Sequence, residues 1–364
     1  MIALVADLHL GAGGRLEPQR DAWLEAVDIA NDEAVALVIA GDVFHRARPT
    51  PDELTVFADG LDRLRIPTIA IAGNHDVSGI SSATALEVLV RGRRNMRAAR
   101  EPQTFESPNE TIAVLPWSPL RPSADTLLDV ARALYARCNP DLPSALVCHW
   151  SIGGALLPSG ARVDDVMRET MLPLRELETL GFDAVFAGHI HRRQYLTLPE
   201  LGAPPILYLG SLMAVDHSEA DTDHAVTLWD PSSGDVSQID LEHGPRFVTL
   251  DIQGDLEPAL LEPMLAAQHD LAGAIVRVRY SGTPQELAGV SPDLVRGAFA
   301  DTPAEISLEP TVVRAANERG AELEESTTPL EAMQAWLADQ AGISPELAAR
   351  MLEETARYQD EARS

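Results

Sequence analysis

Lysine is absent from the 364-residue chain, so all 28 side chains of the lysine–arginine class are arginines. The 56 acidic residues outnumber them, which leaves a formal net charge of −28 at pH 7. Domains that bind nucleic acids in general usually carry a basic face, so this charge argues against such a domain. Any binding to phosphate must therefore use local groups of arginines.

Cysteine and long apolar runs are also scarce. Cys138 and Cys148 are the two cysteines, which is too few for a disulfide framework and typical of a reducing compartment. The apolar residues 2–6 follow no basic leader, so we expect no signal peptide. No apolar run approaches the roughly 20 residues that a membrane-spanning helix needs. These absences predict a cytoplasmic protein without a membrane partner.

Five short motifs contain six of the ten histidines. They are Asp7-Leu8-His9, Gly41-Asp42-Val43-Phe44-His45, Gly73-Asn74-His75-Asp76, Cys148-His149-Trp150 and Gly188-His189-Ile190-His191. Nearly every motif follows an apolar, β-branched run that predicts a buried strand, over residues 2–6, 36–40, 68–72, 145–148 and 184–187. Because open α/β sheets bind ligands at the carboxyl ends of their strands, we expect these polar side chains to gather around one crevice.

Strands and amphipathic helices alternate as far as about residue 241. The predicted helices cover residues 18–34, 50–65, 125–137 and 164–180, and the later strands cover 206–209, 225–229 and 236–241. In the helix over 50–65, Thr50, Pro51 and Glu53 form a capping box. Alternation followed by antiparallel strands predicts an α/β domain over residues 1–243, a two-sheet sandwich flanked by helices.

Two further parts follow this domain. Residues 244–317 predict a small α+β domain, with strands at 246–252, 274–280 and 305–308 and helices at 257–268 and 291–300. Residues 318–364 combine an acidic linker with two helices, over 328–341 and 344–357.

The residue types in the motifs are those that hold divalent metal ions. Two ions about 3.5–4 Å apart activate a water molecule and clamp the oxygens of a phosphodiester. Asp42 is expected to bridge the ions. One ion would take Asp7, His9 and one histidine of the pair His189 and His191, and the other ion would take Asn74, His149 and the remaining histidine. This mixture of nitrogen and oxygen suits manganese, iron or zinc better than calcium or magnesium.

Each motif alone is weak evidence. Asp7-x-His9 occurs by chance, His189 and His191 also suit a structural zinc pair, and Asn74 suits an ordinary turn. Their joint appearance, in this order and at strand ends, favours the metal site.

Together, the five motifs resemble those of the calcineurin-like metallophosphoesterases over residues 1–241. The sequence Gly-Asp-Val-Phe-His resembles the SbcD-type DNA-repair nucleases of that family more than its small phosphatases. The resemblance implies a four-layer αββα sandwich with two divalent ions, most often Mn²⁺, and places His191 on the first ion and His189 on the second. It further implies that His75 contacts the scissile phosphate and protonates the leaving oxygen, and that His45 helps handle the DNA or the reacting phosphate. A purely hydrogen-bonding role for His45 and His75 stays open.

The later chain extends the resemblance. Residues 208–219 are similar to the Gly-Ser stretch and acidic segment of these nucleases, and residues 244–317 resemble their DNA-capping domain. The tail resembles the helices that dock on the coiled-coil base of an SbcC-type ATPase, through an apolar face formed by Leu330, Met333, Trp336 and Leu337. The alternative is that this face packs on its own domain. Asp223 and His224 stand where relatives often carry Lys-Gly, so we assign no role there. The resemblance also implies a homodimer.

Arginines near the motifs are the candidate DNA contacts. The segment 91–100 is densely cationic, and Arg91, Arg93, Arg94 and Arg97 are expected to bind phosphates, although pairing with surface carboxylates is an equal alternative. Arg192 and Arg193 follow the last motif and are expected to grip the DNA backbone without reading bases.

The sequence thus predicts a metal-dependent DNA exo- or endonuclease of repair and recombination, the nuclease subunit of an SbcCD-like complex associated with the nucleoid. Its expected substrates are double-stranded ends, hairpins or single strands. One alternative is a stand-alone phosphodiesterase for a small molecule such as a cyclic nucleotide, which has no use for His45, the cap or the tail. Another is a non-catalytic scaffold, which need not retain all seven ligands.

Overall fold

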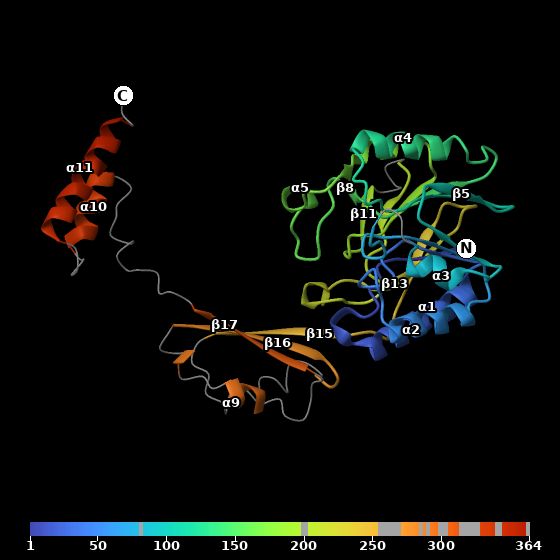
Figure 1. Ribbon diagram of the computed structural model, residues 1–364, viewed down its shortest axis with the longest axis horizontal. Coiled ribbons are helices and arrows are strands. Elements are labelled where there is room, and N and C mark those ends of the chain that lie inside the picture. The colour runs from blue at the N-terminus through green and yellow to red at the C-terminus, as the bar shows by residue number, and fades with distance from the viewer. Residues whose placement is uncertain are drawn as a thin grey trace. The chain divides into compact units, whose positions relative to one another are not determined.

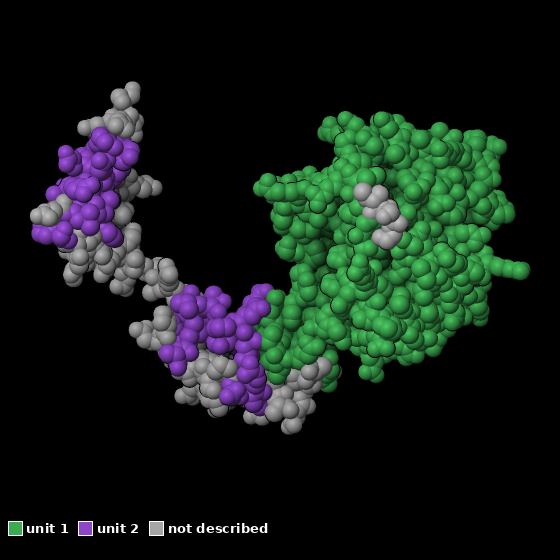
Figure 2. All heavy atoms as spheres, viewed as in Figure 1, with its two compact units in different colours: residues 1–250, 269–278, 299–307 green, residues 251–268, 279–298, 308–364 purple. Residues whose placement is uncertain are grey.

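The computed structural model describes residues 1–79, 83–197, 203–253, 271–283, 287–288, 292–297, 305–312, 328–338 and 344–361. The chain forms two compact units, coloured separately in Figure 2. The first comprises residues 1–250, 269–278 and 299–307, and the second comprises residues 251–268, 279–298 and 308–364.

Two six-stranded sheets form the centre of the first unit (Figure 1). One sheet has the order β14-β13-β1-β2-β3-β4, in which β1 to β4 are parallel and β13 runs antiparallel to both β1 and β14. Its strands are β1 (Ile2–Val5), β2 (Ala36–Ile39), β3 (Thr68–Ile71), β4 (Met96–Ala99), β13 (Ala225–Trp229) and β14 (Val236–Asp240).

The other sheet has the order β11-β12-β10-β7-β6-β5. Its four middle strands are parallel and its two edge strands are antiparallel to their neighbours. Its strands are β5 (Gln103–Glu106), β6 (Thr111–Leu115), β7 (Ser144–Cys148), β10 (Ala184–Ala187), β11 (Gln194–Thr197) and β12 (Ile206–Tyr208).

Helices cover the outer faces of both sheets (Figure 1). Strand β1 shows why, because its side chains alternate between two cores. Ala3 and Val5 pack with α1 (Leu16–Glu33) and α2 (Pro51–Arg63), next to α3 (Ala85–Val90). Ile2 and Leu4 face the core between the sheets, where Phe186 lies 5.8 Å from Trp229 between ring centroids. The second sheet is covered by α4 (Ala124–Tyr135) and α6 (Leu174–Glu178). The predicted four-layer αββα sandwich is confirmed.

A local signal in the sequence explains the start of helix α2, whereas another predicted helix is not formed as expected. The capping box at the start of α2 is present, with Glu53 N donating to Thr50 Oγ1 and Thr50 N to Glu53 Oε2. The predicted helix over residues 164–180 is wrong. This stretch contains α5 (Val163–Val166), then β9 (Met171–Leu172), which pairs with β8 (Ser151–Ile152), and finally α6. Pro173 marks the boundary between β9 and α6, since proline disfavours helix in the residue before it.

The other described elements include two 3-10 helices, η1 (Ala12–Gly14) and η3 (His217–Glu219), a three-stranded sheet and three α-helices. The sheet has the order β15-β16-β17, formed by β15 (Phe247–Gln253), β16 (Ile275–Gly282) and β17 (Glu305–Val312), and α9 (Pro292–Gly297) precedes its last strand. The predicted helix over 257–268 lies outside the described residues. Helices α10 (Pro329–Ala338) and α11 (Pro345–Glu361) pack together, and Leu330 N donates to Gln359 Oε1 at 3.2 Å. Within the described ranges, no helix combines the length and apolarity needed to cross a membrane.

Candidate metal centre

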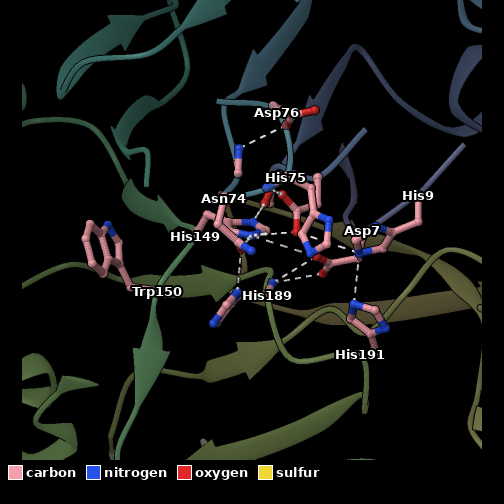
Figure 3. Close-up of polar contacts among 12 residues, drawn as sticks. Asp7, His9, Asn74, His75, Asp76, His149, Trp150, His189 and His191 are labelled. Atoms are coloured by element: carbon pink, nitrogen blue, oxygen red, sulfur yellow. Dashed lines mark hydrogen bonds and ion pairs between the residues drawn. The ribbon is translucent and has the colours of Figure 1, made fainter. Parts of the chain in front are cut away.

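The seven predicted ligands come together beyond the carboxyl ends of five parallel strands. They follow β1, β2, β3, β7 and β10, and Figure 3 shows how those that it labels converge. Their donor atoms fall into two groups whose members all lie within 4.8 Å of one another: Asp7, His9 and His191 in one, and Asp42, His149 and His189 in the other. Asn74 joins the second group, because its Oδ1 lies 2.9 Å from His189 Nδ1 and 3.1 Å from His149 Nε2. Trp150 points away from the cluster (Figure 3).

Unusual backbone angles mark four of these residues. The φ angles of Asp7, His9, Asp42 and His189 are 51°, 44°, 50° and 85°. Residues other than glycine rarely adopt this left-handed backbone conformation. Each such residue reduces the stability of the fold by on the order of 1–3 kcal/mol. Among the described residues, Arg121 is the other non-glycine residue with a positive φ. Strain concentrated on predicted ligands indicates that the surrounding loops are built to place these side chains.

Glycine is required where the motif loops approach one another. A Cβ at Gly73 would lie 2.1 Å from Asp42 Oδ1, and one at Gly188 would lie 2.3 Å from Ala40 O. Without such a Cβ, the loop after β3 reaches Asp42, whose Oδ1 accepts the His75 N–H at 2.8 Å. The Gly-Asp-Val-Phe-His and Gly-Asn-His-Asp motifs are therefore in direct contact.

Asp76 fastens the same two loops together. Its buried carboxylate accepts backbone N–H groups from Gly73 at 3.0 Å, Phe44 at 3.2 Å and Val43 at 3.4 Å. Burial raises the pKa of Asp76 to about 7, and the negative charge of Asp42 adds to this. Asp76 thus holds the loops that carry the ligands, and it lies beside the ligand cluster (Figure 3).

Three histidines use one ring nitrogen to hold the ring and direct the other into the site. His149 Nδ1–H donates to Ala40 O at 2.7 Å, which leaves Nε2 facing Asp42 Oδ2 at 3.3 Å. His191 Nδ1–H donates to Glu219 Oε1 at 2.6 Å, and its Nε2 lies 3.0 Å from His9 Nε2. His189 Nε2–H donates to Glu169 Oε1 at 2.6 Å, and its Nδ1 faces Asn74. An outward hydrogen bond of this kind fixes the tautomer of a metal-binding histidine.

The spacing of the inward atoms fits shared divalent ions. His9 Nε2 and His191 Nε2 lie 3.0 Å apart, a separation that either a shared proton or a shared cation allows. Donor atoms held at about 2.0–2.2 Å by one ion lie roughly 3.0–3.5 Å apart. The 3.0 Å between His9 and His191 lies in this range, as do the 3.3 Å between Asp42 and His149 and the 3.1 Å between Asn74 and His149. Asp42 Oδ2 also lies 3.6 Å from His9 Nε2 and 3.3 Å from His149 Nε2, so one oxygen reaches both groups.

The charges of the site call for cations. Burial raises the pKa of Asp7 to about 6, although His149 and His191 act against it. Burial also opposes the charge of Asp42, but His149 and His9 outweigh it and hold the pKa of Asp42 below its ordinary value. Burial lowers the pKa of His149, yet Asp42 and Asp7 raise it to about 10. Protons thus take the place of metal ions between these groups, and metal binding must release them.

Residues 1–193, more than half of the chain, match the family of calcineurin-like phosphoesterases. The chain belongs to this family. The predicted family is therefore confirmed, and with it a metal-dependent hydrolase of phosphoesters.

Two relatives are named DNA double-strand break repair protein Mre11. The protein from Methanopyrus kandleri is 26% identical over 213 residues, which cover 52% of this chain and 44% of that protein. The one from Archaeoglobus fulgidus is 36% identical over 98 residues, or 24% of this chain and 22% of that protein. The matched region thus spans less than half the length of either relative.

Two solved structures are more distant. The TT1561 protein of Thermus thermophilus has a TM-score of 0.44 and 14% identity, covering 66% of this chain and 97% of its own. The Pseudomonas putida nuclease MPE has a TM-score of 0.31 and 16% identity, covering 65% and 87%.

His45 and His75 lie beside the ligands of this calcineurin-like phosphoesterase. The His75 ring is 4.7 Å from His9 and 5.5 Å from His45 between ring centroids. His75 Nδ1–H donates to His45 O at 2.8 Å. Burial, followed by the charge of His75, lowers the pKa of His45. Both histidines are thus placed next to any phosphate that reaches the ligands, and their roles stay predictions.

The arginine segment 91–97 lies at the amino ends of the parallel strands of the first sheet, and the metal ligands lie at the carboxyl ends. Arg94 and Arg97 line a pocket with Ile2, Ala36 and Pro67, which stand where the parallel strands begin. Parallel strands carry the ligands at their other ends, so the structure does not bring these arginines to the metal ligands. Binding of DNA phosphates by Arg91, Arg93, Arg94 and Arg97 stays a prediction.

Two of the predicted DNA-binding arginines contact other residues of this chain. Arg93 pairs with Asp62 at 2.6 Å, as the alternative of surface pairing expected. Arg193 follows the last motif, but its guanidinium donates to Thr227 Oγ1 at 2.5 Å, and burial lowers its pKa. Arg192 is half-buried beside it.

Two carboxylates next to the histidines were not among the predicted site residues. Glu219 accepts from Ser211 Oγ at 2.7 Å as well as from His191, and the acidic segment after the Gly-Ser stretch was its signal in the sequence. Glu169 had no such signal, because it lies in the stretch that was wrongly predicted as a helix.

Proposed function

We propose that this chain is a manganese-dependent DNA nuclease, the nuclease subunit of an SbcCD-like repair complex. The supporting observation is the pair of donor groups that share Asp42, with His45 and His75 beside them. Relatives named as repair proteins favour DNA over other phosphodiesters. The proposed ligands are Asp7, His9 and His191 for one ion, Asn74, His149 and His189 for the other, and Asp42 for both.

The proposed mechanism uses the chain's own residues around the reacting phosphate. Two bound ions would supply an activated water and neutralise charge on the phosphate oxygens. His75 is fixed at Nδ1 by His45 O and at its backbone N–H by Asp42 Oδ1. The imidazolium form of His75 would therefore deliver its Nε2 proton to the leaving oxygen and become the neutral ring with its remaining proton on Nδ1. The His45 ring stacks on His75 at an interplanar angle of 28° and is proposed to contact the neighbouring DNA phosphate.

The decisive experiment compares two substrate classes. We expect the purified protein in Mn²⁺ to cleave labelled blunt-ended or hairpin DNA and to leave a cyclic nucleotide intact. EDTA should stop the cleavage, because the donor groups need their ions. Turnover of the cyclic nucleotide with DNA untouched would instead establish the small-molecule phosphodiesterase.

We further propose roles for the rest of the chain. Residues 244–317 would cap the DNA, and the helices of residues 318–364 would bind the coiled-coil ATPase within a homodimer of the nuclease. Leu330, Met333 and Leu337 on α10 are half-buried, whereas Trp336 is 46% exposed. On α11, Leu347 and Tyr358 are 48% and 61% exposed. The two helices thus leave apolar side chains in solvent, which suits a partner surface.

Removing the tail should separate partner binding from catalysis. A chain truncated to residues 1–327 is expected to keep its nuclease activity, because all proposed ligands precede the cut, and to lose the ATPase subunit. Co-purification with a tagged ATPase measures this, with Trp336→Ala as a milder variant. If the truncated chain still co-purifies, the ATPase binds elsewhere.

A further inference from the structure

Glu169 contacts the metal centre from a segment that carries no motif. Its Oε1 accepts the Nε2–H of His189 at 2.6 Å, and it also accepts the hydroxyl of Ser151. Within the described residues, Glu169 forms its ion pair with His189. Its side chain is 33% exposed and that of His189 is 9% exposed, so the contact lies at the mouth of the buried cluster.

The backbone around Glu169 is fixed independently of the metal ligands. The next residue, Thr170, donates its hydroxyl to Pro122 O at 2.7 Å. Met171 then pairs with Ser151 in the short sheet of β8 and β9. The carboxylate is therefore presented to His189 by a segment that is anchored immediately after Glu169.

The hydrogen bond determines which nitrogen of His189 can bind a metal. With its proton on Nε2 and donated to Glu169, the neutral ring carries its lone pair on Nδ1. That atom lies 2.9 Å from Asn74 Oδ1, an acceptor that offers no proton in return. Two electron pairs at this distance are tolerated when a cation binds both. A carboxylate acceptor also makes the imidazole a stronger ligand.

The charges around the site also support a role of Glu169 in metal binding. Asp7 and Asp42 contribute two negative charges among the proposed ligands, and Glu169 and Glu219 contribute two more through His189 and His191. These four carboxylates thus supply negative charge at or beside the proposed ligands, which favours the binding of divalent cations. The two carboxylates divide between the groups, since Glu219 serves the group of Asp7 and Glu169 serves the group of Asn74.

We propose that Glu169 is a positioning residue that orients His189 and strengthens binding of the second metal ion. The inference rests on the proposed two-metal function. It assigns to the segment between β8 and β9 a part in assembling the metal centre.

Titration of the full-length, metal-free protein with MnCl₂ alone tests this inference. We expect wild type to bind two ions. In Glu169→Ala, one ion should bind as in wild type and the dissociation constant of the other should rise by about 10–100-fold. Glu169→Gln should fall between them, because its amide oxygen still accepts the hydrogen bond without the charge. Glu176→Gln, an exposed glutamate on α6, is the matched control and should bind as wild type.

Combining Glu169→Ala with His189→Ala distinguishes a positioning role of Glu169 from general support of the fold. If Glu169 acts through His189, then Glu169→Ala should cause no further loss in a His189→Ala protein. Excess Mn²⁺ should also restore DNA cleavage in Glu169→Ala. Unchanged binding of both ions would overturn the inference, as would an equal loss in the His189→Ala background or a lower melting temperature of the metal-free variant.

The manganese titrations contain no DNA, so their outcome is independent of the nuclease assay. A protein that binds two ions but cleaves no DNA refutes the proposed substrate and leaves the role of Glu169 standing. A wild-type protein that binds fewer than two ions refutes the two-metal proposal, and this outcome is read before any variant is compared.

Discussion

Asp42→Ala is expected to abolish bound Mn²⁺ and DNA cleavage together. The carboxylate is 1% exposed and its Oδ2 lies within 3.6 Å of a histidine in each donor group, so both groups lose a shared anion. Metal ions contribute several kcal/mol to such reactions, and about 4 kcal/mol corresponds to a rate loss of about 10³-fold. Metal content by mass spectrometry and cleavage of labelled DNA measure the two effects.

The matched control is Asp129→Ala, which removes an exposed aspartate on α4. It should retain both metal and activity. Circular dichroism of metal-free Asp42→Ala should show the wild-type content of helix and strand, because the sandwich cores contain no metal ligand. If this variant keeps its full manganese content, Asp42 does not bridge the ions.

The gathering of the seven proposed ligands was predictable because strand and ligand signals coincide in the sequence. Each apolar run ends where a polar motif begins, and parallel strands bring such ends to one edge of the sheet. The motif glycines added local information, since Gly73 stands where any Cβ would strike Asp42. The fold and the ligand cluster thus follow from short-range patterns and the rule for parallel sheets.

The contacts of Glu169 and of the arginine segment were not predictable in this way. Glu169 contacts His189, which lies twenty residues later in the chain. The segment of Glu169 is placed by the pairing of Met171 with Ser151, and this short pairing leaves no periodic pattern in the sequence. The arginines of 91–97 follow the Gly-Asn-His-Asp motif closely in sequence, but the chain crosses to the start of β4 before they appear. Nearness in sequence to a ligand motif therefore does not bring these arginines close to the ligands in space, because the strands carry the ligands at their other ends. The density of arginines in the sequence does not indicate at which end of the strands they lie.

His75→Ser is expected to keep both metal ions and to lose most cleavage of DNA. The His75 ring is tied to His45 O and its backbone to Asp42, so the side chain is held beside the ligands without belonging to either proposed ligand set. A positioned general acid contributes about 10²–10⁴-fold to a rate, which sets the expected loss. Manganese titration and single-turnover cleavage of a labelled hairpin measure the two properties separately.

A substrate with a good leaving group separates proton donation from phosphate binding by His75. The leaving oxygen of bis(p-nitrophenyl) phosphate needs no proton, so His75→Ser should hydrolyse it at nearly the wild-type rate while DNA cleavage stays low. His243→Ser is the matched control, because His243 is exposed and contacts Glu25 on α1 rather than the metal ligands. Equal losses on both substrates would show that His75 binds the phosphate and that another group supplies the proton. An unchanged rate on DNA would remove His75 from the mechanism.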